Sequence, residues 1–82
     1  MAEQDGKRNL VGGRVRKARL SLKPVVAQED LTNRMANRGV YFDRSVISRI
    51  EAGDRYVKDY ELAALAKCLK VSVSWLMGEK GA

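Results

Sequence analysis

Hydrophobic residues recur at helical intervals in the first third of the chain. Val11, Val15, Ala18 and Leu22 follow one another at steps of four, three and four residues, which is the spacing of one face of an α-helix. The pattern predicts a first helix over residues 10–21, with this face buried against the rest of the protein.

The next apolar positions predict a second helix after a short connection. Pro24 disfavours helical backbone for the residue before it, so the chain is expected to leave the first helix there. A new helix should begin near Gln28, bury Leu31 and Met35, and end at Gly39, because glycine readily adopts the left-handed backbone that stops a helix.

Two more helices are predicted in the C-terminal part. Asp59 is expected to open the longer one, and Ser72 to cap a short one, VSWLM, which ends at Gly78. The apolar positions of the longer helix are Leu62, Leu65, Ala66 and Leu69. They should complete the core of an all-α domain.

The stretch from Gln28 to Gly53 is the part of the chain that looks built to touch something specific. A helix is predicted over residues 44–52, capped by the carboxylate of Asp43 and stopped by Gly53. Phe42 and Ile47 are spaced as a hydrophobic staple, which would set the angle at which the chain enters this helix.

The predicted helix 44–52 has two different faces. Ile47 and Ile50 form an apolar stripe, with Val46 at its edge. The other face carries two guanidinium groups, two hydroxyl groups and no carboxylate, from Arg44, Ser45, Ser48 and Arg49. Side chains of these types read base edges and phosphates.

Together these elements resemble the Cro/phage-repressor, or XRE, type of helix-turn-helix DNA-binding domain. The resemblance lies in four motifs in this order: VGGRVRKAR, QEDLTNRM, SVISRIEAG and ELAALAKCLKVSVSWLMG. It implies a compact five-helix lambda-repressor-like domain over residues 10–78, after a flexible basic arm at 1–9 and before a C-terminal tail at 79–82. The connection from 37 to 42 is longer than the tight turn of about 3–4 residues usual in the family.

The resemblance also implies a function and a set of site residues. The protein would be a sequence-specific transcriptional regulator, with repression favoured, that reads the major groove of double-stranded DNA with helix 44–52. Base contacts would come from Arg44, Ser45 and Arg49, and phosphate contacts from Gln28, Arg55 and Lys58. In the family an arginine of the first helix pairs with a glutamate near the end of the recognition helix, and Arg19 and Glu51 stand at the matching places.

A helix of this size reads few bases, so a homodimer on a pseudo-palindromic site is expected. The net charge is +6, and seven basic residues but no acidic residue lie between Lys7 and Lys23. This asymmetry is typical of a polyanion-binding surface. The alternative is a solvated helix face with a solubilising tail.

Composition argues against several other classes of protein. With one cysteine, Cys68, and no histidine, neither an intramolecular disulfide nor a zinc-ligand set can form, and no metal or cofactor is expected. Neither a paired-carboxylate or histidine site nor an activated nucleophile is visible, so an enzyme is not expected. The apolar runs are too short for a membrane span, and the N-terminal thirty residues are too charged for a signal peptide, which favours a cytoplasmic protein.

A second function of the same fold stays open. Trp75, Leu76 and Met77 are too apolar to be left fully exposed, so some should pack on the core while others form a contact with another protein chain. The domain could then be a protein-binding module, for instance an antitoxin-like or anti-regulator partner that binds through Trp75 and Met77.

Overall fold

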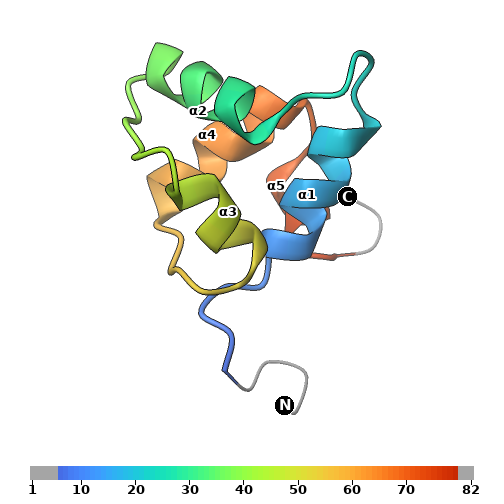
Figure 1. Ribbon diagram of the computed structural model, residues 1–82. Coiled ribbons are helices and arrows are strands. Elements are labelled where there is room, and N and C mark those ends of the chain that lie inside the picture. Colours follow the sequence, from blue (N-terminus) through green and yellow to red (C-terminus); the bar gives the residue numbers. More distant parts are fainter. Residues whose placement is uncertain (1–5, 80–82) are drawn as a thin grey trace.

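Residues 6–79 are described by a computed structural model and contain five helices and no strand. The helices are α1 (Gly12–Ser21), α2 (Gln28–Asn37), α3 (Val46–Glu51), α4 (Asp59–Leu69) and α5 (Val73–Leu76). In Figure 1, α2 lies above α3, α1 stands to the right and α4 passes behind. The Cα radius of gyration is 11.9 Å, close to the roughly 12 Å expected of a compact chain of this length.

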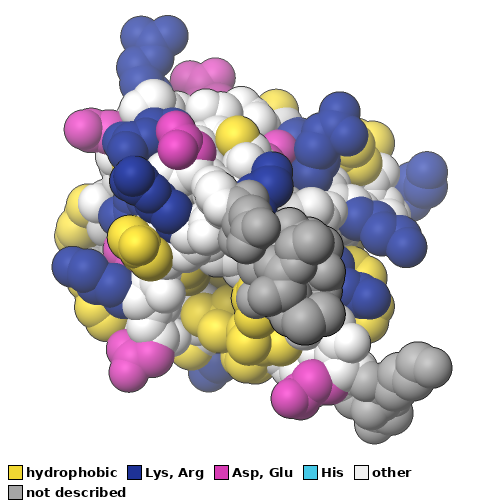
Figure 2. All heavy atoms as spheres, turned by 90° about the horizontal axis from the view of Figure 1, so that it is seen from below, with side chains coloured by type: hydrophobic (Ala, Val, Ile, Leu, Met, Phe, Trp, Pro, Cys, Tyr) yellow, Lys and Arg dark blue, Asp and Glu magenta, His cyan; other side chains and the backbone are white. Residues whose placement is uncertain are grey.

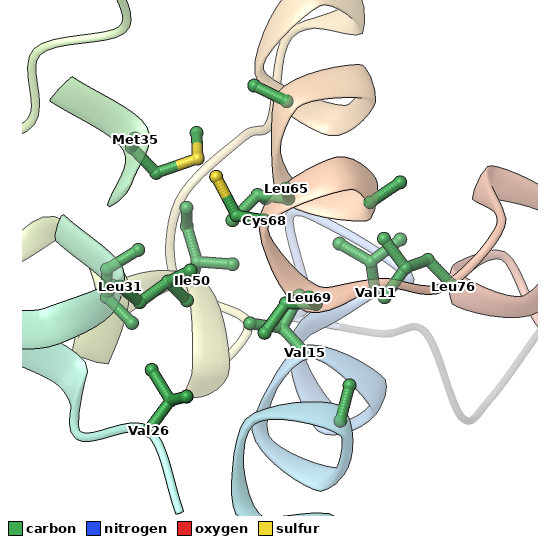
Figure 3. Packing of buried hydrophobic residues seen from close by; sticks show 14 of the residues in the cluster. Val11, Val15, Val26, Leu31, Met35, Ile50, Leu65, Cys68, Leu69 and Leu76 are labelled. Carbon is green, nitrogen blue, oxygen red and sulfur yellow. The ribbon is translucent and has the colours of Figure 1, made fainter. Parts of the chain in front are cut away.

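Side chains from all five helices meet in one hydrophobic core. Figure 3 shows Leu31 of α2 beside Ile50 of α3, and Val15 of α1 beside Leu69 of α4, all of them buried. Leu76 of α5 is also fully buried. The predicted stripe of the first helix is confirmed, since Val11, Val15 and Ala18 are buried and Leu22 is half-buried. Close packing of this kind makes the relative positions of the helices depend on the shapes of these side chains.

The predicted ends of α2 and α5 are confirmed. Gly39 has a φ of +83°, and its N–H donates to the carbonyl of Ala36 at 2.9 Å, as in a left-handed helix stop. Ser72 caps α5, because its hydroxyl oxygen accepts from the N–H of Trp75 at 2.9 Å. At the start of α2, the Asp30 carboxylate accepts from the N–H of Ala27 at 3.3 Å, so Asp30 satisfies an end that Ala27 cannot cap.

The third helix is shorter than predicted, and the predicted cap is wrong. α3 begins at Val46 after a turn at residues 44–45. Asp43 contributes its main-chain carbonyl, which accepts from the N–H of Val46 at 3.0 Å. Ser45 stands at the cap position and makes no side-chain capping bond. Because the cap lies two residues later than expected, Phe42 and Ile47 are not in staple register, although both pack on the core.

The helix also ends at Glu51, one residue earlier than predicted, but its stop is the expected one. Gly53 has a φ of +77° and donates its N–H to the Ile50 carbonyl at 2.9 Å. The main-chain N–H of Asp54 donates to the Arg49 carbonyl at 2.8 Å. This pair of bonds closes the helix in a Schellman motif. None of the helices within residues 6–79 has the length and apolar content needed to cross a membrane.

Candidate nucleic-acid interface

The outer flank of α3, defined as Arg44, Ser45, Ser48 and Arg49, lies on the protein surface. All four residues are exposed, whereas Val46, Ile47 and Ile50 are buried beneath them. The Ser48 hydroxyl donates to the Ser45 carbonyl at 3.1 Å, which ties the turn to the helix. The predicted division of this segment into an apolar inner side and a cationic outer side is therefore present.

A buried network holds the inner side of α3 against α1 and α2. Arg19 of α1 donates from Nε to Glu51 Oε2 at 2.7 Å and from Nη2 to Oε1 at 3.0 Å. Its third nitrogen donates to the Val26 carbonyl at 2.9 Å. The hydrogen bond to Glu51 raises the pKa of Arg19, although burial acts in the opposite direction. The predicted Arg19–Glu51 pair is thus present, in the bidentate form that fixes geometry as well as charge.

Gln28 belongs to this same network. Its Nε2 donates to Glu51 Oε1 at 3.0 Å, and the residue is half-buried. The amide expected to contact a phosphate therefore donates to a carboxylate of the protein, at a partly buried position. The start of α2 is still held beside α3, with its first main-chain N–H groups pointing away from the helix body.

The C-terminal end of α3 is held by residues that were predicted to be a mobile arm. Asn9 Nδ2 donates to the carbonyls of Ile50 at 3.1 Å and Arg55 at 2.8 Å. Lys7 Nζ donates to the Ala52 carbonyl at 3.2 Å, and the Arg8 N–H to the Gly53 carbonyl at 2.8 Å. Residues 7–9 therefore contact the folded domain, which corrects this part of the 1–9 prediction. Residues 1–5 and 80–82 lie outside the described residues.

Asn9 also lies at the start of α1, which begins at Gly12 and not at residue 10 as predicted. Its Oδ1 accepts from the N–H groups of Val11 at 3.0 Å and Gly12 at 2.8 Å, which satisfies the start of the helix. An asparagine just before an apolar helical stripe was the signal for this cap. Gly12 itself allows α1 to approach α3, because a Cβ there would clash with the Ile50 carbonyl oxygen.

Arg55, predicted to contact phosphate, forms an ion pair with Glu61 and remains partly exposed. Its Nη1 and Nη2 donate to the two carboxylate oxygens of Glu61 at 3.0 and 3.2 Å, and its guanidinium stacks 5.1 Å from the centre of the Phe42 ring. The Glu61 carboxylate also accepts from the Lys58 N–H at 2.9 Å. Arg55 therefore organises the loop after α3. The signal that could have found this pair is Glu61 itself, three residues after the helix cap.

The other predicted phosphate residue, Lys58, is exposed. Its ammonium group lies 6.0 Å from the centre of the Tyr60 ring. Lys58 precedes α4, and its main-chain N–H is held by the Glu61 carboxylate. Of the two cations among the predicted phosphate residues, Lys58 is the more exposed, and it is not in an ion pair within residues 6–79.

The basic residues between Lys7 and Lys23 do not form one continuous anionic-ligand surface. Arg19 is buried, and Arg14 stacks 4.8 Å from the centre of the Trp75 ring. Figure 2 shows lysine and arginine side chains around much of the visible face, with fewer acidic groups between them. Three of the cations on and after α1 remain exposed: Arg16, Lys17 and Lys23.

The apolar C-terminal residues divide between core and surface as predicted. Leu76 is buried and Trp75 half-buried, whereas Met77 is 38% exposed. Met77 borders a hollow of about 310 Å³, which we call the apolar hollow, and Figure 2 shows hydrophobic side chains gathered on this face. The hollow is lined by Arg8, Asn9, Leu10, Val11, Val57, Asp59, Leu62 and Met77.

Cys68 is a packed residue, as expected. It is buried in the core cluster, and burial raises the pKa of its thiol against the opposing effect of Arg38 and Arg34. A neutral buried thiol is a poor nucleophile. Within residues 6–79, no group of three His, Cys, Asp or Glu side chains is placed to bind a metal ion.

Comparison of the chain with protein-family models, curated proteins and solved structures finds no match.

Proposed function

We propose that the protein is a sequence-specific double-stranded DNA-binding transcriptional regulator of the XRE helix-turn-helix type, acting as a repressor. The observation that carries the proposal is the outer flank of α3: four exposed side chains that can donate hydrogen bonds and carry no negative charge. The Arg19–Glu51–Gln28 network supports it, because the only carboxylate of α3 is paired on the inner side.

In this mechanism, cations distributed over the surface capture DNA by releasing its counterions, and α3 then enters the major groove. The planar fork of Arg44 or Arg49 suits O6 and N7 of guanine, and the Ser45 hydroxyl can donate to or accept from a base edge. Lys58 contacts backbone phosphate, and the start of α2 directs main-chain N–H groups to another phosphate. Arg55 acts through the loop that carries Lys58.

The proposed regulator binds as a homodimer to a pseudo-palindromic site. The apolar hollow supports a contact between two copies, because its lining includes one basic and one acidic residue, Arg8 and Asp59. Around a two-fold axis, Arg8 of one copy would meet Asp59 of the other, and each would border shared apolar surface.

The same hollow is the reason to keep a second candidate function, a protein-binding module of this fold. The exposed part of Met77 would then contact an unrelated chain. A gel shift with mixed genomic DNA at low salt separates the two functions, since a module that binds only protein would shift no DNA.

Selection of bound duplexes from a random pool tests the proposal directly, since it yields both the site sequence and the half-site spacing. Arg49→Ala should relax the preference at one base position and cost about 1–3 kcal/mol there. Lys58→Ala should weaken all sequences alike and lower the salt slope by about 1. Arg16→Ala on α1 is the matched control and should leave base preference unchanged. Uniform loss in both test variants would contradict the proposed docking of α3.

A further inference from the structure

A second cluster of cations lies at the opposite flank of α2 from the outer flank of α3. An open hollow of about 560 Å³ is lined by Arg34, Asn37, Arg38, Lys67, Cys68 and Lys70. Four of these six residues are cations and none is acidic. We call the four cations the α2–α4 basic cluster. None of them forms an ion pair with a carboxylate of residues 6–79.

The position of the basic cluster follows from the helical geometry of α2. Gln28, Glu29, Thr32 and Asn33 line a separate hollow next to Arg44. At 100° per residue, Arg34 and Asn37 lie roughly 140° around the helix axis from the centre of that set. The buried seam of Leu31 and Met35 lies between the two. The centre of the basic cluster is therefore on a different side of α2 from the hollow beside Arg44.

Local folding explains only part of this cluster. Arg34 has a structural task, because its Nη1 donates to the Cys68 carbonyl at 3.2 Å at the C-terminal end of α4. Lys70, in contrast, has a backbone conformation that a lysine adopts at a cost. It adopts left-handed backbone, with a φ of +61°, where a glycine would avoid the steric cost of a Cβ. Stability of the chain alone would favour glycine there.

The chemistry of the hollow fits a chain of phosphates better than a single enclosed anion. A site for one phosphate surrounds it with converging, buried donors, but residues 6–79 hold no buried side-chain donor without a partner. Arg38, Lys67 and Lys70 are all exposed and come from two different helix ends. Spread cations of this kind match the closely spaced charges of a nucleic-acid backbone.

We propose that the α2–α4 basic cluster binds the sugar–phosphate backbone of a second DNA duplex, so that the protein bridges two duplexes. This inference rests on the proposed function, because α3 is taken to hold the first duplex. The second contact is independent of base sequence, since lysines and arginines on a phosphate backbone carry no sequence information.

Two matched triple variants test the cluster. The first combines Arg38→Gln, Lys67→Gln and Lys70→Gly, and the last change also removes the left-handed strain. The control combines Arg16→Gln, Lys17→Gln and Lys23→Gln. All six positions are exposed, and each variant lowers the net charge from +6 by three, so both end at the same total.

Bridging is measured by a capture assay. The protein is bound to an immobilised duplex that carries the selected site, and the amount of a labelled random-sequence duplex that it then retains is recorded. The cluster variant should capture at least about tenfold less of the labelled duplex than the wild type does. The salt slope of capture should fall by about 2–3, because three phosphate contacts are lost. The control variant should lose less capture than the cluster variant does, because it removes the same charge but none of the cluster contacts. Equal loss in the two variants would show that total charge is responsible and would overturn the proposal.

Amide chemical shifts of the full chain, titrated with random-sequence duplex, separate this proposal from the proposed function. Shifts at both 34–38 and 67–70, as well as at 44–49, are expected. Shifts only at 44–49 would overturn the basic cluster and leave the function of α3 supported. Shifts only at the cluster would contradict the function of α3 and overturn the bridging of two duplexes. Tripolyphosphate that binds the cluster as tightly as duplex would overturn a nucleic-acid ligand in favour of a small polyanion.

Discussion

Two arginine–glutamate pairs flank α3, and they differ in what they join. Arg19 Nε lies 2.7 Å from Glu51 Oε2, and the two side chains are 8% and 4% exposed. Arg55 Nη1 lies 3.0 Å from Glu61 Oε1, and these side chains are 24% and 4% exposed. In both pairs the glutamate is buried. The first arginine is nearly as buried as its partner, and the second borders solvent.

The neighbours of each pair show the consequence. Glu51 is 32 positions from Arg19 and also accepts from Gln28, so this pair connects α1, α2 and α3. Glu61 is six positions from Arg55 and accepts from the Lys58 N–H, so this pair fixes one loop to the first turn of α4. The same chemistry therefore has a tertiary role in one place and a local role in the other.

The largest expected effect is from Glu51→Gln. The substitution leaves the Arg19 guanidinium buried without a carboxylate, which should lower the free energy of unfolding by about 3–5 kcal/mol. Chemical denaturation measures it, and Glu29→Gln, at an exposed carboxylate of α2, is the control with an expected change within about 0.5 kcal/mol. DNA affinity should fall through misplacement of α3, with the salt slope preserved. A variant that unfolds as the wild type does would contradict the tertiary role of this pair.

Glu61→Gln should have a smaller effect, a loss of about 1–3 kcal/mol, because Arg55 can turn toward solvent and one oxygen acceptor remains for the Lys58 N–H. Hydrogen exchange should increase mainly over residues 54–62, while α1 and α3 keep their protection. Exchange that increases equally along α1 would show that the second pair is not local. The distinction between the two pairs would then be wrong.

The smallest effect is the acid dependence of stability. Burial alone would raise the pKa of Glu61, but hydrogen bonds from Arg55 and the Lys58 N–H outweigh burial, so its pKa is lowered. A lowered folded-state pKa contributes stability that is present above the unfolded pKa, near 4.3, and is lost as pH falls through the folded value. Unfolding free energies of wild type and Glu61→Gln, measured from pH 6 downward, should therefore begin to converge as the pH falls below the unfolded pKa of about 4.3. A gap that stays constant over this range would contradict the assignment.

Much of the fold could be predicted because its signals are local. The stripe from Val11 to Leu22, the stop at Gly39 and the cap at Ser72 each depend on residues within one or two helical turns, and all are present. The boundaries of α3 were less predictable. The carboxylate of Asp43 is a good helix cap, but the N–H of Val46 donates to the main-chain carbonyl of Asp43 instead. The sequence alone does not show which of these two oxygens, in the same residue, accepts the hydrogen bond.

The sequence by itself determined the helices, the apolar side of α3 and the cationic character of its outer flank, since helical periodicity assigns each residue to a face before any packing occurs. Resemblance to a family was needed to match Arg19 with Glu51. Only the tertiary structure decided that Asn9 holds the end of α3, that Gly12 sits against the Ile50 carbonyl and that Arg55 turns inward to Glu61. These contacts join residues far apart in the chain or choose one partner among several nearby charges. Side-chain type does not determine such choices, because they depend on which backbone groups the packed helices bring within hydrogen-bonding distance.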